Sequence, residues 1–141
     1  MGGNETLITR PRLLLIDDEP KLAAFVASAA RISGFEPVET SQDGDFRAAF
    51  DEERPAMVVL DLQMPGMDGV ELLRFLAERK FEQPVLIISG FDRRVLDSAF
   101  RFGKELGLNM KGPIEKPARL DDLEATLRSN LPSVPQGTRE P

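Results

Sequence analysis

The chain has 141 residues, of which 30% are charged and 41% are hydrophobic, and its formal net charge is −6. That length suits one domain with a hydrophobic core, and an acidic chain without a basic stripe argues against direct nucleic-acid binding. Because the sequence has no cysteine and no histidine, disulfides, thiol catalysis and histidine bases are excluded, and a metal ion would need oxygen ligands, which suit Mg²⁺, Mn²⁺ or Ca²⁺.

The N-terminal third of the chain predicts a strand, a helix and a second strand. Residues 1–10 are polar and are expected to form a flexible segment. Residues 12–16 include an apolar run that is typical of a buried strand. A helix follows, because Pro20 suits a first helical turn and Gly34 suits the left-handed residue that ends a helix. Residues 35–39 are expected to form a short, half-exposed strand.

The middle of the chain predicts a helix and then a strand that ends at a single carboxylate. Ser41 or Asp43 can cap this helix, which is expected to end before Pro55. Residues 56–60 are apolar at every position, so they are typical of a parallel strand buried on both faces. The run stops at Asp61. Taken alone, an aspartate in this position could simply cap a turn.

The same pattern continues with another helix and strand. A helix is expected to start at Asp68, with Glu71 three residues later as in a capping box. Its inner face is predicted to consist of leucines: Leu72, Leu73 and Leu76. Pro84 opens a further apolar strand, which stops at Ser89.

The C-terminal part predicts the last two helices and one strand. Apolar residues recur at helical spacing at Val95, Leu96, Ala99 and Phe100, and Gly103 falls inside that pattern. Residues 108–114 predict a weak strand. The last helix is marked by Leu120, Leu123 and Leu127. Residues 131–141 are expected to be a flexible tail or linker.

Strands and helices therefore alternate five times, which predicts an α/β domain with a parallel sheet, helices on both faces and right-handed crossovers. Polar groups follow four of the predicted strands: the pair Asp17 and Asp18, then Asp61, then Ser89, and finally Lys116. In open α/β sheets, ligands and chemistry gather at the carboxyl ends of the strands. Each group also has an ordinary explanation, such as a charge at a helix N-terminus or a solvated lysine.

Taken together, these residues resemble the receiver domain of bacterial two-component response regulators, over residues 11–130. The likeness rests on Asp17 and Asp18, on Asp61 within Asp-x-x-Met-Pro-x-Met-Asp-Gly, and on two dipeptides, Ser89-Gly90 and Lys116-Pro117. It implies a flavodoxin-like (βα)5 three-layer sandwich with strand order 2-1-3-4-5. It also implies a cis Lys116-Pro117 bond.

The resemblance implies a metal site made of acids. The carboxylates of Asp17, Asp18 and Asp61, with the backbone carbonyl of Gln63, would hold Mg²⁺ or Mn²⁺. Asp61 would then act as a nucleophile and accept a phosphoryl group as an acyl phosphate.

The remaining groups would contact the transferred phosphoryl group. Lys116 would pair with one of its oxygens as a point charge, and the Ser89 hydroxyl would bind another. Backbone N–H groups of Leu62 and Gly90 would complete the phosphoryl site.

The resemblance also implies a signalling role in place of independent catalysis. The domain would receive its phosphoryl group from a histidine kinase or a histidine phosphotransfer protein, and would catalyse only its own phosphorylation and dephosphorylation. It would act on a downstream protein target, or form a phosphorylation-dependent homodimer. No apolar run reaches membrane-spanning length and the start lacks a signal pattern, so a cytoplasmic location in a bacterium is expected, without membrane or nucleic-acid partners.

One departure keeps alternatives open. Many receivers carry an aromatic residue three positions before the lysine, where this chain has Pro113. Signalling is therefore expected to run through residues 89–106 and a surface that includes Phe91 and Phe102. The chain could instead be a receiver-like interaction module that takes no phosphate. A haloacid-dehalogenase-type phosphatase fits less well, because its Asp-x-Asp motif is absent after the first strand.

A narrower likeness concerns receivers joined to EAL-type cyclic-di-GMP phosphodiesterases. It rests on the runs 88–96 and 111–117 and on the long helix between them. The chain is too short to include an EAL domain. On this interpretation it would be an N-terminal fragment of such a phosphodiesterase or a stand-alone relative.

Overall fold

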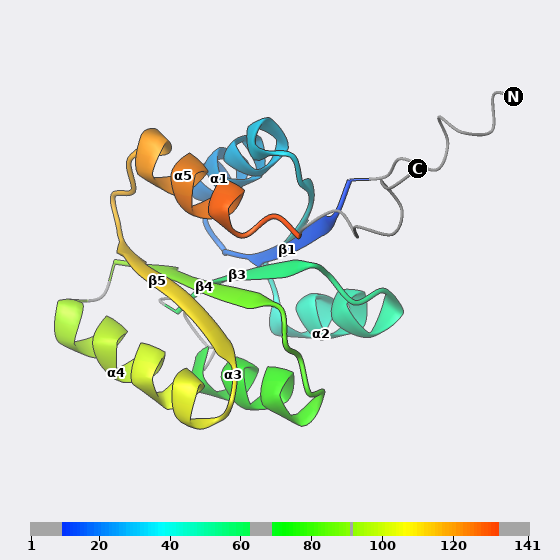
Figure 1. Cartoon of the computed structure of the whole chain (residues 1–141), viewed down its shortest axis with the longest axis vertical. Helices are drawn as coiled ribbons and strands as arrows, with labels where there is room; N and C mark the ends of the chain where they lie inside the picture. Colours follow the sequence, from blue (N-terminus) through cyan, green and yellow to red (C-terminus); the bar gives the residue numbers. More distant parts are fainter. Residues whose placement is uncertain (1–9, 63–68, 91, 133–141) are drawn as a thin grey trace, which may run out of the picture.

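A computed structural model of the chain describes residues 10–62, 69–90 and 92–132. Within these residues a five-stranded parallel sheet has the strand order β2-β1-β3-β4-β5 (Figure 1). The elements are β1 (Arg12–Ile16), α1 (Pro20–Ser33), β2 (Glu36–Thr40), α2 (Asp43–Glu52), β3 (Met57–Asp61), α3 (Gly69–Glu78), β4 (Pro84–Ser89), α4 (Arg93–Glu105), β5 (Asn109–Glu115) and α5 (Leu120–Ser129). The predicted α/β class, strand order and flavodoxin-like architecture are confirmed.

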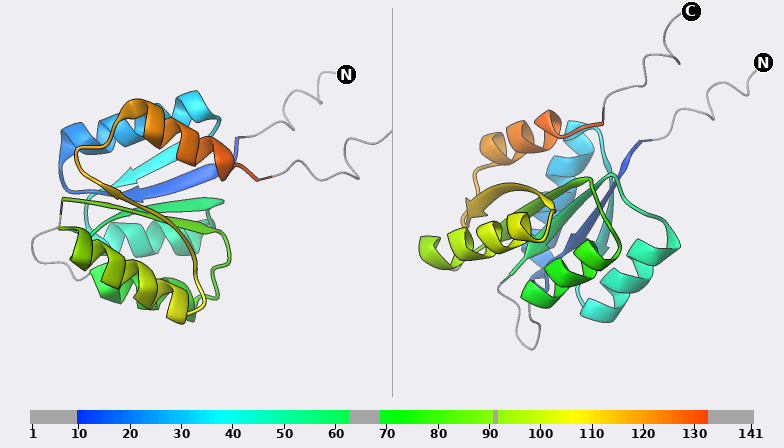
Figure 2. Two further views of the ribbon diagram at one scale, coloured as in Figure 1. Left: turned by 60° about the vertical axis from the view of Figure 1, so that its left-hand side comes forward. Right: turned by 60° about the horizontal axis from the view of Figure 1, so that its bottom comes forward.

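The helices cover both faces of the sheet and make three layers. Helices α1 and α5 lie on one face, and α2, α3 and α4 lie on the other (Figures 1 and 2). Because successive side chains of a strand point to opposite faces, β1 contributes Leu13 and Leu15 to one core and Leu14 and Ile16 to the other. Both faces of the central strands are therefore apolar, as the sequence predicts.

Both ends of α1 agree with the sequence prediction, whereas the start of α2 does not. Pro20 is the first residue of α1, and Gly34 ends it in the left-handed conformation with φ 111°. The predicted cap of α2 is wrong, because Gln42 occupies the N-cap position without a side-chain hydrogen bond. Asp43 lies inside the first turn and accepts a hydrogen bond from Arg47 Nε at 2.9 Å, so its carboxylate binds a side chain one turn along the helix.

Several boundaries differ from the sequence prediction by one residue. Strands β2, β3 and β5 each begin and end one position later than expected. Asp68 lies outside the described residues, so its proposed capping role stays a prediction. The cap of α4 is Asp92, whose carboxylate accepts a hydrogen bond from the Val95 backbone N–H at 3.1 Å. The sequence analysis did not identify this cap.

Helix α4 is continuous through Gly103, where the absence of a side chain allows close packing on β5. A Cβ atom at Gly103 would clash with Met110 Sδ. By contrast, two residues that fit the apolar periodicity are not in the core. Val95 is 43% exposed and Leu120 is 41% exposed, and both lie in the first turn of a helix.

Strand β5 is irregular, as its glycine and proline predict. Its pairing with β4 shifts register between Leu86 and Ile88, and Gly112 has φ 79°. The peptide bonds before Pro113 and Pro117 are both cis, which confirms the bond implied for Lys116-Pro117. Among the described helices, none combines the length and the apolar composition that crossing a membrane requires.

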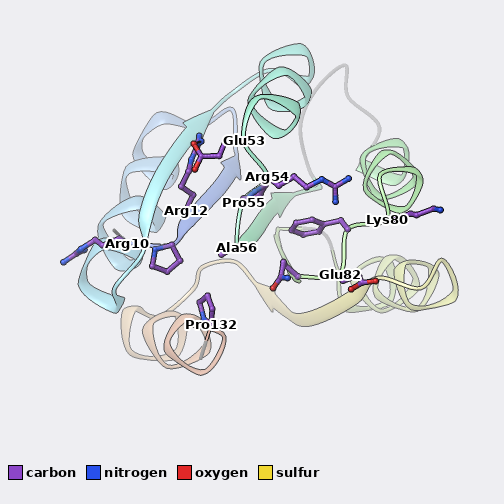
Figure 3. A pocket seen from close by; sticks show the side chains of 12 residues that line it. Arg10, Arg12, Glu53, Arg54, Pro55, Ala56, Lys80, Glu82 and Pro132 are labelled. Carbon is purple, nitrogen blue, oxygen red and sulfur yellow. Dashed lines mark hydrogen bonds and ion pairs between the residues drawn. The ribbon is translucent and has the colours of Figure 1, made fainter. Parts of the chain in front are cut away.

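The two edges of the sheet differ in shape and composition. At the carboxyl ends of the strands, acidic side chains follow β1 and β3. At the amino ends, a cleft of about 530 Å³ lies between the segments that precede β1, β3 and β4 (Figure 3).

Candidate functional site

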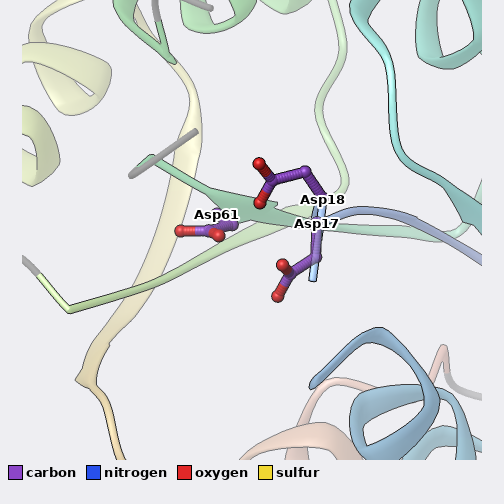
Figure 4. A group of neighbouring side chains, drawn as sticks. All are labelled: Asp17, Asp18 and Asp61. Carbon is purple, nitrogen blue, oxygen red and sulfur yellow. The ribbon is translucent and has the colours of Figure 1, made fainter. Parts of the chain in front are cut away.

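Three aspartates converge at the carboxyl edge of the sheet. Asp17 directly follows β1 and Asp61 ends the neighbouring strand β3, where Ile16 pairs with Leu60. One carboxylate oxygen each from Asp17, Asp18 and Asp61 lies within 4.8 Å of the others (Figure 4). Asp17 and Asp61 are buried, at 3% and 2% exposure, whereas Asp18 is exposed. The structure therefore brings together the three acids that the sequence analysis selected.

The position of Asp17 is set by the turn between β1 and α1. Its backbone N–H donates to the Thr40 carbonyl at 3.1 Å, which ties the turn to the end of β2. Its Oδ1 accepts a hydrogen bond from the Glu19 backbone N–H at 2.9 Å. This local bond orients the carboxylate and leaves Oδ2 directed at the other charged groups.

Lys116 lies between two of the three acids. Its Nζ is 3.0 Å from Asp61 Oδ2 and 3.5 Å from Asp17 Oδ2. The Lys116 backbone N–H donates to the Ser89 carbonyl at 2.9 Å, so the lysine is held beside the end of β4. Its side chain is only 16% exposed, which makes it a partly buried counter-charge in contact with Asp61.

The other predicted phosphoryl contacts lie at the same edge. Ser89 ends β4 and is fully buried, and Gly90 follows it at the surface. Leu62 comes directly after β3 and is 7% exposed. The predicted carbonyl ligand Gln63 and the surface residue Phe91 lie outside the described residues, so their roles stay predictions.

The donor set suits a hard divalent cation. All three groups are carboxylates, and carboxylate oxygens are the ligands that Mg²⁺ and Ca²⁺ prefer in proteins. Three negative charges within a few ångströms repel one another, and Lys116 supplies a single positive charge against them. Two of the carboxylates are also buried, which increases the need for a compensating cation. The residues present therefore fit a bound Mg²⁺ or Mn²⁺.

A cleft opens beside two of the three acids, Asp17 and Asp18. A cleft of about 240 Å³ is lined by Asp17 and Asp18, by Pro20 and Ala23 of α1, and by the run 39–41 at the end of β2. Residues 39–41 were not predicted to lie at the site, because no polar group was selected after β2. Their place next to β1 in the sheet brings them to the acids.

A family model described as the response regulator receiver domain matches residues 13–128. Among curated proteins, the transcriptional regulatory protein TrcR of Mycobacterium tuberculosis (strain ATCC 25618 / H37Rv) is 36% identical over 123 residues, which cover 85% of this chain and 45% of that protein. The transcriptional regulatory protein PrrA of the same strain is 37% identical over 86 residues, which cover 60% of this chain and 36% of that protein. The chain thus spans less than half the length of either relative.

A solved structure of the chemotaxis response regulator CheY4 of Vibrio cholerae is similar to the fold. The TM-score is 0.71, and the match covers 87% of this chain and 100% of that chain at 22% identity. At this identity the likeness concerns the fold alone.

Proposed function

The chain belongs to the response regulator receiver family, whose general function is phosphorylation on an aspartate, and we propose that Asp61 is its phosphoacceptor in a Mg²⁺-dependent phosphorelay. The observation that carries the proposal is the convergence of three carboxylates with Lys116, whose Nζ lies 3.0 Å from Asp61 Oδ2. Asp61 is the acid of the three that ends a strand in the middle of the sheet, next to Lys116 and beside the strand that ends at Ser89.

In the proposed reaction, an Asp61 carboxylate oxygen attacks the phosphorus of a phosphohistidine or a small phosphodonor. The new O–P bond forms as the bond from phosphorus to the donor's nitrogen or oxygen breaks, and the donor keeps that electron pair. A cation held by Asp17, Asp18, Asp61 and the Gln63 carbonyl would neutralise the charge that gathers on the phosphoryl oxygens.

The protein's own groups would position the phosphoryl group. The Lys116 ammonium would pair with a phosphoryl oxygen once the Asp61 carboxylate has become an acyl phosphate and lost its own negative charge. The Ser89 hydroxyl and the backbone N–H groups of Leu62 and Gly90 would donate to the remaining oxygens. The hydrogen bond from the Lys116 backbone to the Ser89 carbonyl supports this assignment, because it holds two of these groups together.

The partners follow from the family. We propose that a histidine kinase or a histidine phosphotransfer protein donates the phosphoryl group, and that a downstream protein or a second copy reads it. The domain would span residues 11–130, with residues 1–10 and 131–141 as flanking segments. Within this domain no nucleic-acid contact is proposed, and a cytoplasmic location stays a prediction.

The readout is proposed to centre on α4, β5 and α5, the elements nearest Ser89 and Lys116. Val95 and Leu120 are exposed apolar residues near the starts of α4 and α5. Phe102 of α4 lies under the Arg74 guanidinium at 5.3 Å, which links α4 to α3. Phosphorylation would favour one of two conformations of the loop after Ser89. Because the two conformations make different contacts, the change would alter this surface.

A second candidate is a receiver-like interaction module that takes no phosphate. Pro113 favours it, because the aromatic residue that many receivers use at this position is absent. The narrower likeness to receivers joined to EAL-type phosphodiesterases also stays a prediction.

Intact mass after incubation with acetyl phosphate and Mg²⁺ separates the two candidates. We expect the wild-type chain to gain one phosphoryl group that is labile to hydroxylamine, and Asp61→Asn to gain none. Asp45→Asn, which changes an exposed aspartate of α2, should behave as wild type. A wild-type chain that never gains mass would favour the interaction module, and modification of Asp61→Asn at the wild-type rate would place the acceptor elsewhere.

A further inference from the structure

The cleft at the amino edge of the sheet has an apolar wall. Its apolar lining consists of three prolines, an alanine and an aromatic ring: Pro11, Pro55, Ala56, Phe81 and Pro132 (Figure 3). Pro55 and Phe81 are buried, whereas Pro132 is exposed at the rim. At about 530 Å³ the cleft is within the range of sites that take a small molecule or a few side chains.

The arginines around this cleft already have partners, so they do not require an anionic ligand. Arg10 donates to the Arg31 carbonyl at 2.8 Å, and Arg54 donates to the Arg79 carbonyl. Arg12 forms an ion pair with Glu53. The part of the apolar lining that stays accessible consists of Pro11, Ala56 and Pro132.

The C-terminal end of the described chain reaches this cleft. Helix α5 ends at Ser129, and Leu131 then packs against the core between α1 and the sheet. A Leu131 methyl carbon lies 3.4 Å from the position that a Cβ of Gly34 would take. Pro132 follows and lines the cleft. The described part of the chain therefore ends at the rim of the cleft.

The sequence of this segment favours an extended path. It reads Leu131-Pro132-Ser133-Val134-Pro135, and a residue that precedes proline is driven away from the helical conformation. In an extended chain, alternate side chains point to the same side, so Val134 falls on the side of Pro132. Two residues span about 7 Å, which keeps Val134 within reach of the cleft wall.

We propose that the cleft binds Val134 and Pro135 of the chain's own C-terminal segment. The polypeptide would then leave the domain from a defined point at the amino edge, opposite the three aspartates. This would fix where any region that follows residue 135 begins relative to the domain. The proposal does not depend on phosphorylation of Asp61, and its main competitor is the segment that precedes Arg10 in the sequence, residues 1–9 with Leu7 and Ile8.

Amide and methyl NMR on the full chain tests the proposal with a matched pair of variants. In the wild type we expect nuclear Overhauser contacts between the Val134 methyls and the Phe81 ring. Val134→Ser should abolish them and shift the amides of Ala56, Phe81 and Gln83. Leu7→Ser, a similar loss of one apolar side chain from the other segment, should leave these amides unchanged.

A spin label gives an independent readout, because the chain has no cysteine that would take the label elsewhere. A nitroxide on Gln136→Cys should broaden the amides of Ala56 and Gln83 in the otherwise wild-type chain, and adding Val134→Ser should reduce that broadening. The proposal is overturned if Val134→Ser leaves the cleft amides unshifted. It is equally overturned if Leu7→Ser shifts them, because residues 1–9 would then be the occupant.

Discussion

The two ends of the strands differ in charge and in how their charged side chains are paired: acids gather at the carboxyl edge of the sheet and arginines lie at its amino edge. At the carboxyl edge, Asp17, Asp18 and Asp61 lie together with one lysine between them. At the amino edge, arginines lie apart and each bonds an oxygen of its own: Arg10 to the Arg31 carbonyl, Arg12 to Glu53 and Arg54 to the Arg79 carbonyl. Each of these arginines thus has an acceptor of its own, whereas three carboxylates share one lysine. The carboxyl edge is therefore the one whose charges are not balanced one to one.

This difference in charge between the two edges has a simple physical cause. Each helix returns antiparallel to the strands, so helix N-termini lie at the carboxyl edge and helix C-termini lie at the amino edge. Helix C-termini carry partial negative charge and unpaired carbonyl groups, which favour cations. Arg10 bonds the end of α1 and Arg54 bonds the residue after α3, as this rule expects. The same rule favours single acids beside the helix N-termini at the carboxyl edge, but it does not account for three carboxylate oxygens within 4.8 Å of one another.

The largest expected effect tests whether the acids hold a metal ion. Saturating Mg²⁺ at about 100 times its dissociation constant should raise the free energy of unfolding of the wild type by about 2.7 kcal/mol. Asp18→Asn should lose most of that gain at the same concentration, because one of three carboxylate ligands is gone. Chemical denaturation with and without Mg²⁺ measures both values.

The matched control for that experiment is Asp45→Asn, since Asp45 is exposed on α2 and is not one of the three clustered acids. It should keep the full Mg²⁺ effect. If Mg²⁺ stabilised Asp18→Asn and the wild type equally, the three acids at the carboxyl edge would not be a metal site.

The next effect concerns the lysine between the acids. Lys116→Ala should fold but lose about 1–3 kcal/mol of stability without Mg²⁺, because Asp17 and Asp61 are left buried without their counter-charge. Mg²⁺ should recover most of this loss, since a bound cation would replace the missing charge. Lys21→Ala, at an exposed position of α1, should change stability by no more than about 0.5 kcal/mol. A loss in Lys116→Ala that Mg²⁺ does not reduce would mean that the lysine acts through packing.

At the amino edge, backbone conformation should matter more than charge. Lys80 follows α3 with φ 57°, and Gly34 follows α1 in the same left-handed region. Lys80→Gly should therefore stabilise the domain by about 1 kcal/mol, and Gly34→Ala should destabilise it by a similar amount. Neither change should alter the Mg²⁺ effect. Thermal unfolding of both variants, with and without Mg²⁺, tests this separation of the edges.

The smallest effect is a pH dependence near the amino edge. Arg79 donates two hydrogen bonds of 2.9 Å to Asp51, and these bonds hold the pKa of the Asp51 carboxyl below its ordinary value. A lowered pKa in the folded state means that the unfolded chain binds more protons. The pair therefore contributes fully above about pH 4, the ordinary value for aspartate, and its contribution is lost as the pH falls through the lowered pKa.

Because both partners are exposed, this contribution should be small and sensitive to salt. Asp51→Asn should flatten the acid side of the stability curve slightly, and 1 M NaCl should flatten the wild-type curve in the same way. Identical curves for the wild type and Asp51→Asn at low salt would show that the ion pair contributes nothing to folding.

Much of the carboxyl edge could be predicted from the sequence, because its residues follow local patterns. The apolar runs before Asp17, Asp61 and Ser89 define three strands by composition alone. Once strands alternate with helices, their carboxyl ends must share one edge. The family resemblance then supplied the strand order, which places β1 beside β3 and brings Asp17 to Asp61.

Other features depend on which segments meet in space, and local patterns do not carry that information. From the sequence alone, Gly103 lowers the expected stability of its helix. The structure shows that the glycine leaves room for Met110 of β5. Val95 and Leu120 fit the apolar periodicity yet lie in solvent, since periodicity shows which side of a helix is apolar but not how far its neighbours extend.

The sequence by itself thus determined the class of fold and the set of charged residues that follow the strands, because both arise from short-range composition and spacing. Only the tertiary structure decided that Lys116 bridges Asp17 and Asp61 and that the arginines bond carbonyl groups or single carboxylates. It also decided that Pro132 lines the same cleft as Pro55 and Phe81. These pairings join residues that lie far apart in the chain, and packing of the helices on the sheet is what sets their distances.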